Sequence, residues 1–211
     1  MNFRSRRLRS IAVVLAAALA LAGCAYYAQV GPGAYAIHGR LDVTLDTTWN
    51  RQVDGPGNIW PETWTKNGPL LDVLHVAPAI EDGKTLVGKL SEQALREFPR
   101  FRSGSSSADI VELVQGTLAK ARQGGDFVPI SVEPAKIAGQ DGIRFEFQFG
   151  TGGDGGIETD RHALGYAFEY EKRLYVILFH AAEIHFFPLL RPVAEAIVAS
   201  ARLPQTRTAA R

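Results

Sequence analysis

The chain has 211 residues, a formal net charge of +1 at pH 7 and a hydrophobic content of 46%. That apolar share is typical of globular proteins and argues against a disordered chain. No run rich in Lys or Arg follows Arg9, which argues against a nucleic-acid partner, and a single cysteine excludes an internal disulfide.

The first 23 residues have the pattern of a secretory signal peptide. An arginine cluster, at positions 4, 6, 7 and 9, precedes an apolar run from Ile11 to Ala22. That run is too short to cross a bilayer, and small residues stand before Cys24, where a signal peptidase would cut. We therefore expect residues 1–23 to be removed on export.

The sequence Leu21-Ala22-Gly23-Cys24 resembles the lipobox of bacterial lipoproteins. The resemblance implies that Cys24 is acylated, for example with palmitate, and becomes the first residue of a membrane-anchored protein. The alternative is an ordinary free thiol. Ala25 follows the cysteine, which in enterobacterial lipoproteins would favour the outer membrane. We expect an envelope protein whose domain lies in the periplasm.

Three further segments are expected after the signal peptide. Residues 24–34 predict a short tether, because Gly31-Pro32-Gly33 disfavours regular structure. Residues 35–204 predict a single α/β domain, and residues 205–211 a frayed tail.

The first half of the domain predicts strands and one long helix. Residues 37–45 alternate as a strand that Trp49-Asn50 breaks, and Asn67-Gly68 suits the turn of a hairpin between residues 64–66 and 70–76. Residues 91–98 predict a short helix. Residues 108–122 predict an amphipathic helix with Ser107 as its N-cap.

The second half predicts four strands and a final helix. The strands span residues 132–138, 143–149, 159–170 and 174–180, and the helix spans residues 186–201. In the second strand four large apolar residues share one face, while Arg144, Glu146 and Gln148 share the other. The order predicts an α+β fold, with an antiparallel sheet covered by two long helices.

Residues 140–203 resemble the PsbP-like fold, an α/β/α sandwich. The resemblance consists of a turn, an aromatic strand, two further strands and the end of the last helix. Its residues are Asp141-Gly142 for the turn, Ile143–Phe149 for the aromatic strand, Phe168-Glu169-Tyr170 at the end of the second strand, Leu174–Phe179 for the third, and Ser200–Leu203. It implies a small bacterial lipoprotein without catalytic activity.

Few residues indicate catalysis or metal binding. The glycine-rich run Gly150–Gly156 lacks the Lys and Ser or Thr of a phosphate loop, so we interpret it as a hairpin loop. The serines at positions 103 and 105–107 form no nucleophile elbow. His162, His180 and Glu183 are the candidates for a metal site, with surface or capping roles as the alternative.

All three tryptophans, Trp49, Trp60 and Trp64, lie within one stretch of 16 residues. Trp60 and Trp64 flank an irregular segment. Exposed, they would form a binding surface for a protein or a glycan. Buried, they would close the open end of the sandwich.

The leading hypothesis is a non-enzymatic accessory or interaction domain, held at the membrane through Cys24, with an envelope protein as its partner and no cofactor. One alternative is a periplasmic hydrolase or metal-dependent enzyme that uses His162, His180 and Glu183. The other is a carrier of a small apolar ligand, which needs a cavity between sheet and helix.

Overall fold

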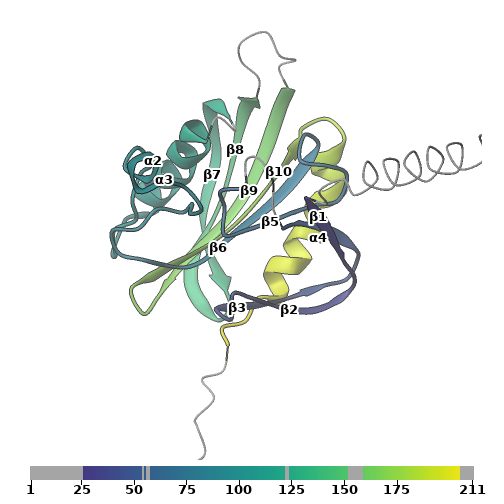
Figure 1. The fold of residues 1–211 in the computed structure, drawn as a ribbon, viewed down its shortest axis with the longest axis horizontal. Helices are drawn as coiled ribbons and strands as arrows, with labels where there is room; N and C mark the ends of the chain where they lie inside the picture. The colour runs from purple at the N-terminus through teal and green to yellow at the C-terminus, as the bar shows by residue number, and fades with distance from the viewer. Residues whose placement is uncertain (1–25, 54, 56–57, 122–123, 152–158, 205–211) are drawn as a thin grey trace, which may run out of the picture.

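The fold is built on one large antiparallel sheet (Figure 1). The computed structural model describes residues 26–53, 55, 58–121, 124–151 and 159–204. Eight strands pair in the order β1-β4-β5-β6-β10-β9-β8-β7, and each pair is antiparallel. Their bounds are β1 Tyr27–Val30, β4 Trp49–Gln52, β5 Glu62–Thr65, β6 Asp72–Glu81, β7 Gly125–Ile137, β8 Gln140–Thr151, β9 Thr159–Tyr170 and β10 Arg173–Ala182.

Two long helices lie on opposite sides of this sheet (Figure 1). They are α3 (Ser107–Lys120) and α4 (Phe186–Ser200), and α2 (Glu92–Leu95) is a single turn. A separate hairpin of β2 (Gly33–Ile37) and β3 (Leu41–Leu45) packs beside α4. Within the described part of the chain, no helix has the length and apolar character needed to cross a membrane.

The sheet separates two apolar cores. The buried side chains of α4 join those of β2, β3 and the tryptophan pair Trp49 and Trp64 on one side. Those of α3 join the phenylalanines of β8, together with Leu86, Phe98 and Phe101, on the other. The predicted α+β class with an antiparallel sheet is confirmed. Each long helix covers only part of one face of the sheet. The β2–β3 hairpin covers more of the face under α4, and residues 86–101 cover more of the face under α3.

Alternation along β8 decides which side chains enter which core. Ile143, Phe145, Phe147 and Phe149 are all buried in the core on the α3 side. Successive side chains of a strand point to opposite faces, so Arg144, Glu146 and Gln148 project toward the α4 side. β10, at the centre of the sheet, is buried on both faces, as its continuous apolar run predicts.

The N-terminal region departs from the predicted strand over residues 37–45. The chain turns at His38 and Gly39, which both have positive φ, and Arg40 N donates a hydrogen bond to Ile37 O at 2.9 Å. Two short strands therefore replace one long strand. Trp49-Asn50 starts β4 rather than ending a strand, because it pairs with both β1 and β5.

The predicted tether of residues 24–34 is wrong for most of its length. Tyr27–Val30 forms edge strand β1, which pairs with β4 over four residues, and Gly33 begins β2. The Gly-Pro-Gly sequence is a turn between two strands rather than a linker. Cys24 and the signal peptide lie outside the described residues, as do the expected tail and most of the glycine-rich loop.

Other boundaries differ by smaller amounts. The hairpin at Asn67-Gly68 is confirmed as β5 and β6, and α3 is capped by Ser106, through a capping box with Asp109, rather than by Ser107. β7 begins at Gly125 instead of residue 132. Its two prolines are compatible with a strand because β7 lies at the edge of the sheet, where a missing N–H is tolerated.

Gly165 supplies a test of the packing between β8 and β9. It pairs with Phe145, whose ring lies where a Cβ on Gly165 would sit. We expect Gly165→Ala to lower the free energy of unfolding by about 1–3 kcal/mol, the cost of overpacking a core. Urea denaturation of the purified protein measures this loss. Gly88→Ala, where a Cβ meets nothing within 4 Å, is the control, and equal losses in both variants would contradict the packing argument.

Candidate functional site

The three tryptophans form no binding surface. Trp49 and Trp60 are fully buried and Trp64 is 2% exposed. Trp64 Nε1 donates a hydrogen bond to Glu62 Oε1 at 2.6 Å, inside the protein. The hypothesis of an exposed aromatic patch is therefore wrong. The physical reason is that β4 and β5 extend the sheet through this segment, so its side chains enter the two cores.

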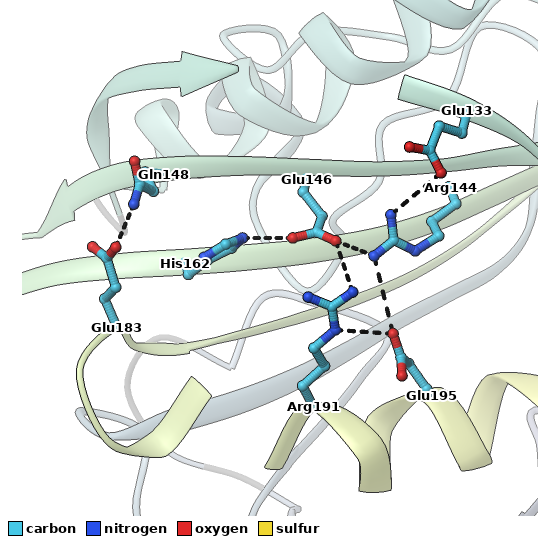
Figure 2. A network of polar contacts seen from close by, with 8 residues as sticks. All are labelled: Glu133, Arg144, Glu146, Gln148, His162, Glu183, Arg191 and Glu195. Carbon is cyan, nitrogen blue, oxygen red and sulfur yellow. Dashed lines mark hydrogen bonds and ion pairs between the residues drawn. The ribbon is translucent and has the colours of Figure 1, made fainter. Parts of the chain in front are cut away.

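The proposed metal ligands His162, His180 and Glu183 do not converge. Ala163 pairs with His180 across β9 and β10, so His162 and His180 project to opposite faces of the sheet. Glu183 accepts a hydrogen bond from Gln148 Nε2 (Figure 2). Across the described residues, no group of three or more His, Cys, Asp or Glu side chains is placed to hold a metal ion. A metal centre built from this trio is thus contradicted.

A polar cluster lies instead between the sheet and α4 (Figure 2). We call it the Glu146 cluster, and it comprises Arg144 and Glu146 of β8, His162 of β9, and Arg191 and Glu195 of α4. Strand alternation places the first three on the α4 side, and the four-residue spacing of Arg191 and Glu195 places both on one side of the helix.

Glu146 is the centre of this cluster. Its side chain is 8% exposed, and its Oε2 lies 2.7 Å from Nε2 of His162. Its Oε1 is paired with Nη2 of Arg144 and lies 3.1 Å from Nη2 of Arg191. Burial alone would raise the pKa of Glu146, but the hydrogen bonds from Arg144 and His162, with the charges of both arginines, outweigh burial and lower it. Glu146 is therefore a carboxylate at neutral pH.

These contacts leave the groups of the Glu146 cluster poorly suited to act on a substrate. Both oxygens of Glu146 are already occupied, and Arg191 is also bound to Glu195, 3.0 Å from Nε to Oε1. The ring of His162 stacks on Phe187 of α4 at 3.8 Å between centroids, which fixes its orientation. A base needs a free lone pair directed at substrate. The arrangement instead joins α4 to β8 and β9.

A second polar cluster is buried on the α3 side of the sheet. Arg161 Nε donates to His180 Nδ1 at 2.9 Å, and Arg161 Nη1 donates to the carbonyl of Leu70 at 2.6 Å. The ring of His75 lies 5.4 Å from that of His180 and stacks on Trp60 at 4.4 Å. Because Nδ1 of His180 accepts a hydrogen bond from Arg161, neutral His180 carries its proton on Nε2, which then has no lone pair for a metal.

Burial controls the ionisation of this second cluster. Burial and the charge of Arg161 lower the pKa of His75 to about 3. The same two causes, with His75 as a third, hold the pKa of His180 well below its ordinary value. Burial also lowers the pKa of Arg161 to about 10. At neutral pH the cluster therefore holds one cation and two neutral rings.

Sequence patterns contained part of this information. The polar face of β8 was visible as Arg144, Glu146 and Gln148, and the spacing of Arg191 and Glu195 marks one side of α4. The polar face of β8 meets this side of α4 only because of where α4 crosses the sheet, which local sequence does not show. Nothing local marks Arg161 as buried, because the sequence of β9 does not show that β6 and β10 enclose its side chain.

The first prediction from these contacts concerns Glu146. We expect Glu146→Gln to lower the free energy of unfolding by about 3 kcal/mol at pH 7, because it leaves two arginines around an uncharged group. The control is Glu133→Gln. Glu133 is 61% exposed and 3.8 Å from Arg144, so its loss should cost less than about 1 kcal/mol. Denaturant titration of both variants measures the two losses of unfolding free energy, and similar losses would count against the central role of Glu146.

The second prediction concerns how the stability of the fold changes in acid. Below the ordinary histidine pKa of 6.5 the unfolded chain binds protons on His75 and His180 that the folded chain does not. Stability therefore falls as the pH falls, by about 1.4 kcal/mol per pH unit for each histidine. Between pH 6.5 and 4.5, His75→Gln should roughly halve this slope, measured by urea titrations at several pH values.

The matched control for that slope is His185→Gln, which removes an exposed histidine. It should leave the slope unchanged, since this side chain is in water in both states. An unchanged slope in His75→Gln would contradict the assignment of acid sensitivity to the buried pair.

Comparisons with known proteins define the fold. No protein-family model and no curated protein sequence matches the chain. The solution structure of cyanobacterial PsbP (CyanoP) from Synechocystis sp. PCC 6803 is similar, with a TM-score of 0.52 and 16% identity over 86% of this chain and 95% of that one.

Two other solved structures are less similar. One is from Bacteroides thetaiotaomicron, with a TM-score of 0.45 and 11% identity over 84% of this chain and 50% of that one. The other is LpqN of Mycobacterium tuberculosis, which is involved in cell envelope biogenesis. Its TM-score is 0.43, with 10% identity over 85% of this chain and 91% of that one. The similarity to CyanoP establishes a PsbP-like fold, as the sequence of residues 140–203 predicted, and at 16% identity it concerns the fold alone.

Proposed function

We propose that this chain is a lipid-anchored protein of the bacterial cell envelope, whose domain acts as a non-enzymatic accessory or interaction module. The observation that carries the proposal is the sequence Leu21-Ala22-Gly23-Cys24, placed directly after an arginine cluster and a short apolar run. Acylation of Cys24 would attach the domain to the membrane. Ala25 after the cysteine favours the outer membrane.

The polar clusters support a non-enzymatic role. In the Glu146 cluster the carboxylate is held by two arginines and a histidine, and His162 is fixed against Phe187. In the second cluster Arg161 occupies the lone pair of His180. Both sets of groups are used in contacts that hold strands and helix together. An interaction module needs only a rigid surface, which such contacts provide.

Anchoring is tested on the full chain expressed in a bacterial host. We expect the wild-type protein in the membrane fraction, with an N-terminal peptide that begins at an acylated Cys24 in mass spectrometry. Cys24→Ala should keep residues 1–23 and carry no acyl group. An unmodified Cys24 in a soluble fraction would refute the anchor. In an enterobacterial host, Ala25→Asp should move the protein to the inner membrane while acylation stays intact.

The interaction role is tested by mild cross-linking followed by affinity purification from membranes. We expect one envelope protein to co-purify repeatedly with the wild-type chain and to be depleted with Cys24→Ala, because anchoring raises the local concentration of both. A stoichiometric bound metal in the purified protein, or turnover of a substrate, would contradict the non-enzymatic role.

A further inference from the structure

The solvent side of α4 is apolar. Its exposed positions are Pro188, Leu189, Pro192, Ala196 and Ala199, and Ile184 precedes them in the turn from β10. Ile184 is 96% exposed and Leu189 is 56% exposed. The polar residue next to them is His185, at the start of the helix. We call this set the α4 outer face.

The two charged residues of α4 border this face rather than lie at its centre, and they are paired with each other, with side chains 37% and 38% exposed. Arg191 and Glu195 both belong to the Glu146 cluster and turn toward β8 (Figure 2). A helix on the surface of a globular protein normally exposes a polar stripe, and a helix that is apolar all round is normally covered. Positions 188, 192 and 196 follow one another at four-residue spacing, so the exposed residues form one stripe.

The opposite side of the domain shows the ordinary pattern. The exposed positions of α3 include Asp109, Glu112 and Lys120, which form a charged outer surface. The two helices pack on opposite faces of the same sheet (Figure 1), and the outer surface of α3 is charged while that of α4 is apolar. This asymmetry indicates that the two sides meet different surroundings.

The position of the anchor identifies those surroundings. Only Ala25 lies between Cys24 and Tyr26, so the two steps of chain span at most about 7 Å. Tyr26 is 44% exposed, and its carbonyl accepts a hydrogen bond from the N–H of Val53, which is 45% exposed. Tyrosine is enriched at membrane–water interfaces. An acylated Cys24 would hold this edge of the sheet at the lipid headgroups.

The same edge leads to the α4 side. Val30, at the end of β1, packs against the core that contains Phe187 and Leu190 of α4. A domain held by so short a link has little freedom to turn, and the face of the sheet that carries α4 begins at this anchored edge.

We propose that the α4 outer face lies against the lipid bilayer and orients the domain on the membrane. This proposal rests on the acylation of Cys24 proposed above. An apolar helix face that lies in the interface is buried to the depth of the headgroup and acyl boundary. The charged surface of α3 then faces away from the membrane, where it is accessible to other envelope components.

The test uses the lipidated full chain in vesicles of phosphatidylcholine and phosphatidylglycerol. Ala196→Cys places a thiol on the α4 outer face, and Ala119→Cys places one at an exposed position of α3 as the matched control. Acylated Cys24 has no free thiol, so each variant takes one environment-sensitive fluorophore. We expect nitroxide-labelled lipid to quench the probe at position 196 roughly twofold more than the probe at position 119.

A second variant tests the apolar character of the face. Leu189→Asp, combined with the probe at position 196, should remove most of that extra quenching, while its unfolding transition stays close to that of the parent because Leu189 is exposed.

Two results would overturn the proposal. Equal quenching at positions 196 and 119 would show that the α4 outer face is in water. Cross-linking of position 196 to a protein in native membranes, without quenching by lipid, would assign the face to a protein partner. Failure of the anchor is recognised separately, because an unacylated wild-type chain reacts with maleimide at Cys24 and does not float with the vesicles.

Discussion

Side chains along β8 alternate between the two faces of the sheet, and both halves of the domain depend on that alternation. One face receives four bulky apolar residues, Phe145 and its neighbours, which form the core under α3. The other presents Arg144 and Glu146, which meet Arg191 of α4. Because the side-chain period is two, a shift of one residue in register would exchange these sets, place charged groups in the core under α3 and break the contacts with Arg191.

Much of the fold was predictable because its signals are local. The alternation of β8, the continuous apolar run of β10 and the last helix over residues 186–201 each follow from neighbouring residues, and the structure confirms them. The Asn67-Gly68 hairpin is predictable for the same reason. The failures lie where partners are distant in sequence. β1 looks like a linker until β4 pairs with it, and Trp60 looks exposed until the strand beside it closes the core.

The candidate site was harder to predict for a related reason. Each polar group of the Glu146 cluster is visible in the sequence as a surface residue, yet the cluster exists only because α4 crosses β8 and β9 at one place. The histidines illustrate the converse error. His162 and His180 lie on neighbouring strands, but register places them on opposite faces. Spacing along the chain fixes side-chain direction only after the pairing of strands is known.

The pairing of β1 with β4 has a mechanical consequence. If Cys24 carries lipid, any pull that extracts the protein from its membrane acts first on Tyr26, whose carbonyl is bonded to Val53, and then on a ladder of four residue pairs at the edge of the sheet. Hydrogen bonds at the free end of an edge strand open one after another under such a pull, instead of all together. The first residues of β1 would then detach before Val30, which packs against the core on the α4 side, and the domain would lengthen its own attachment under load before that core is disturbed.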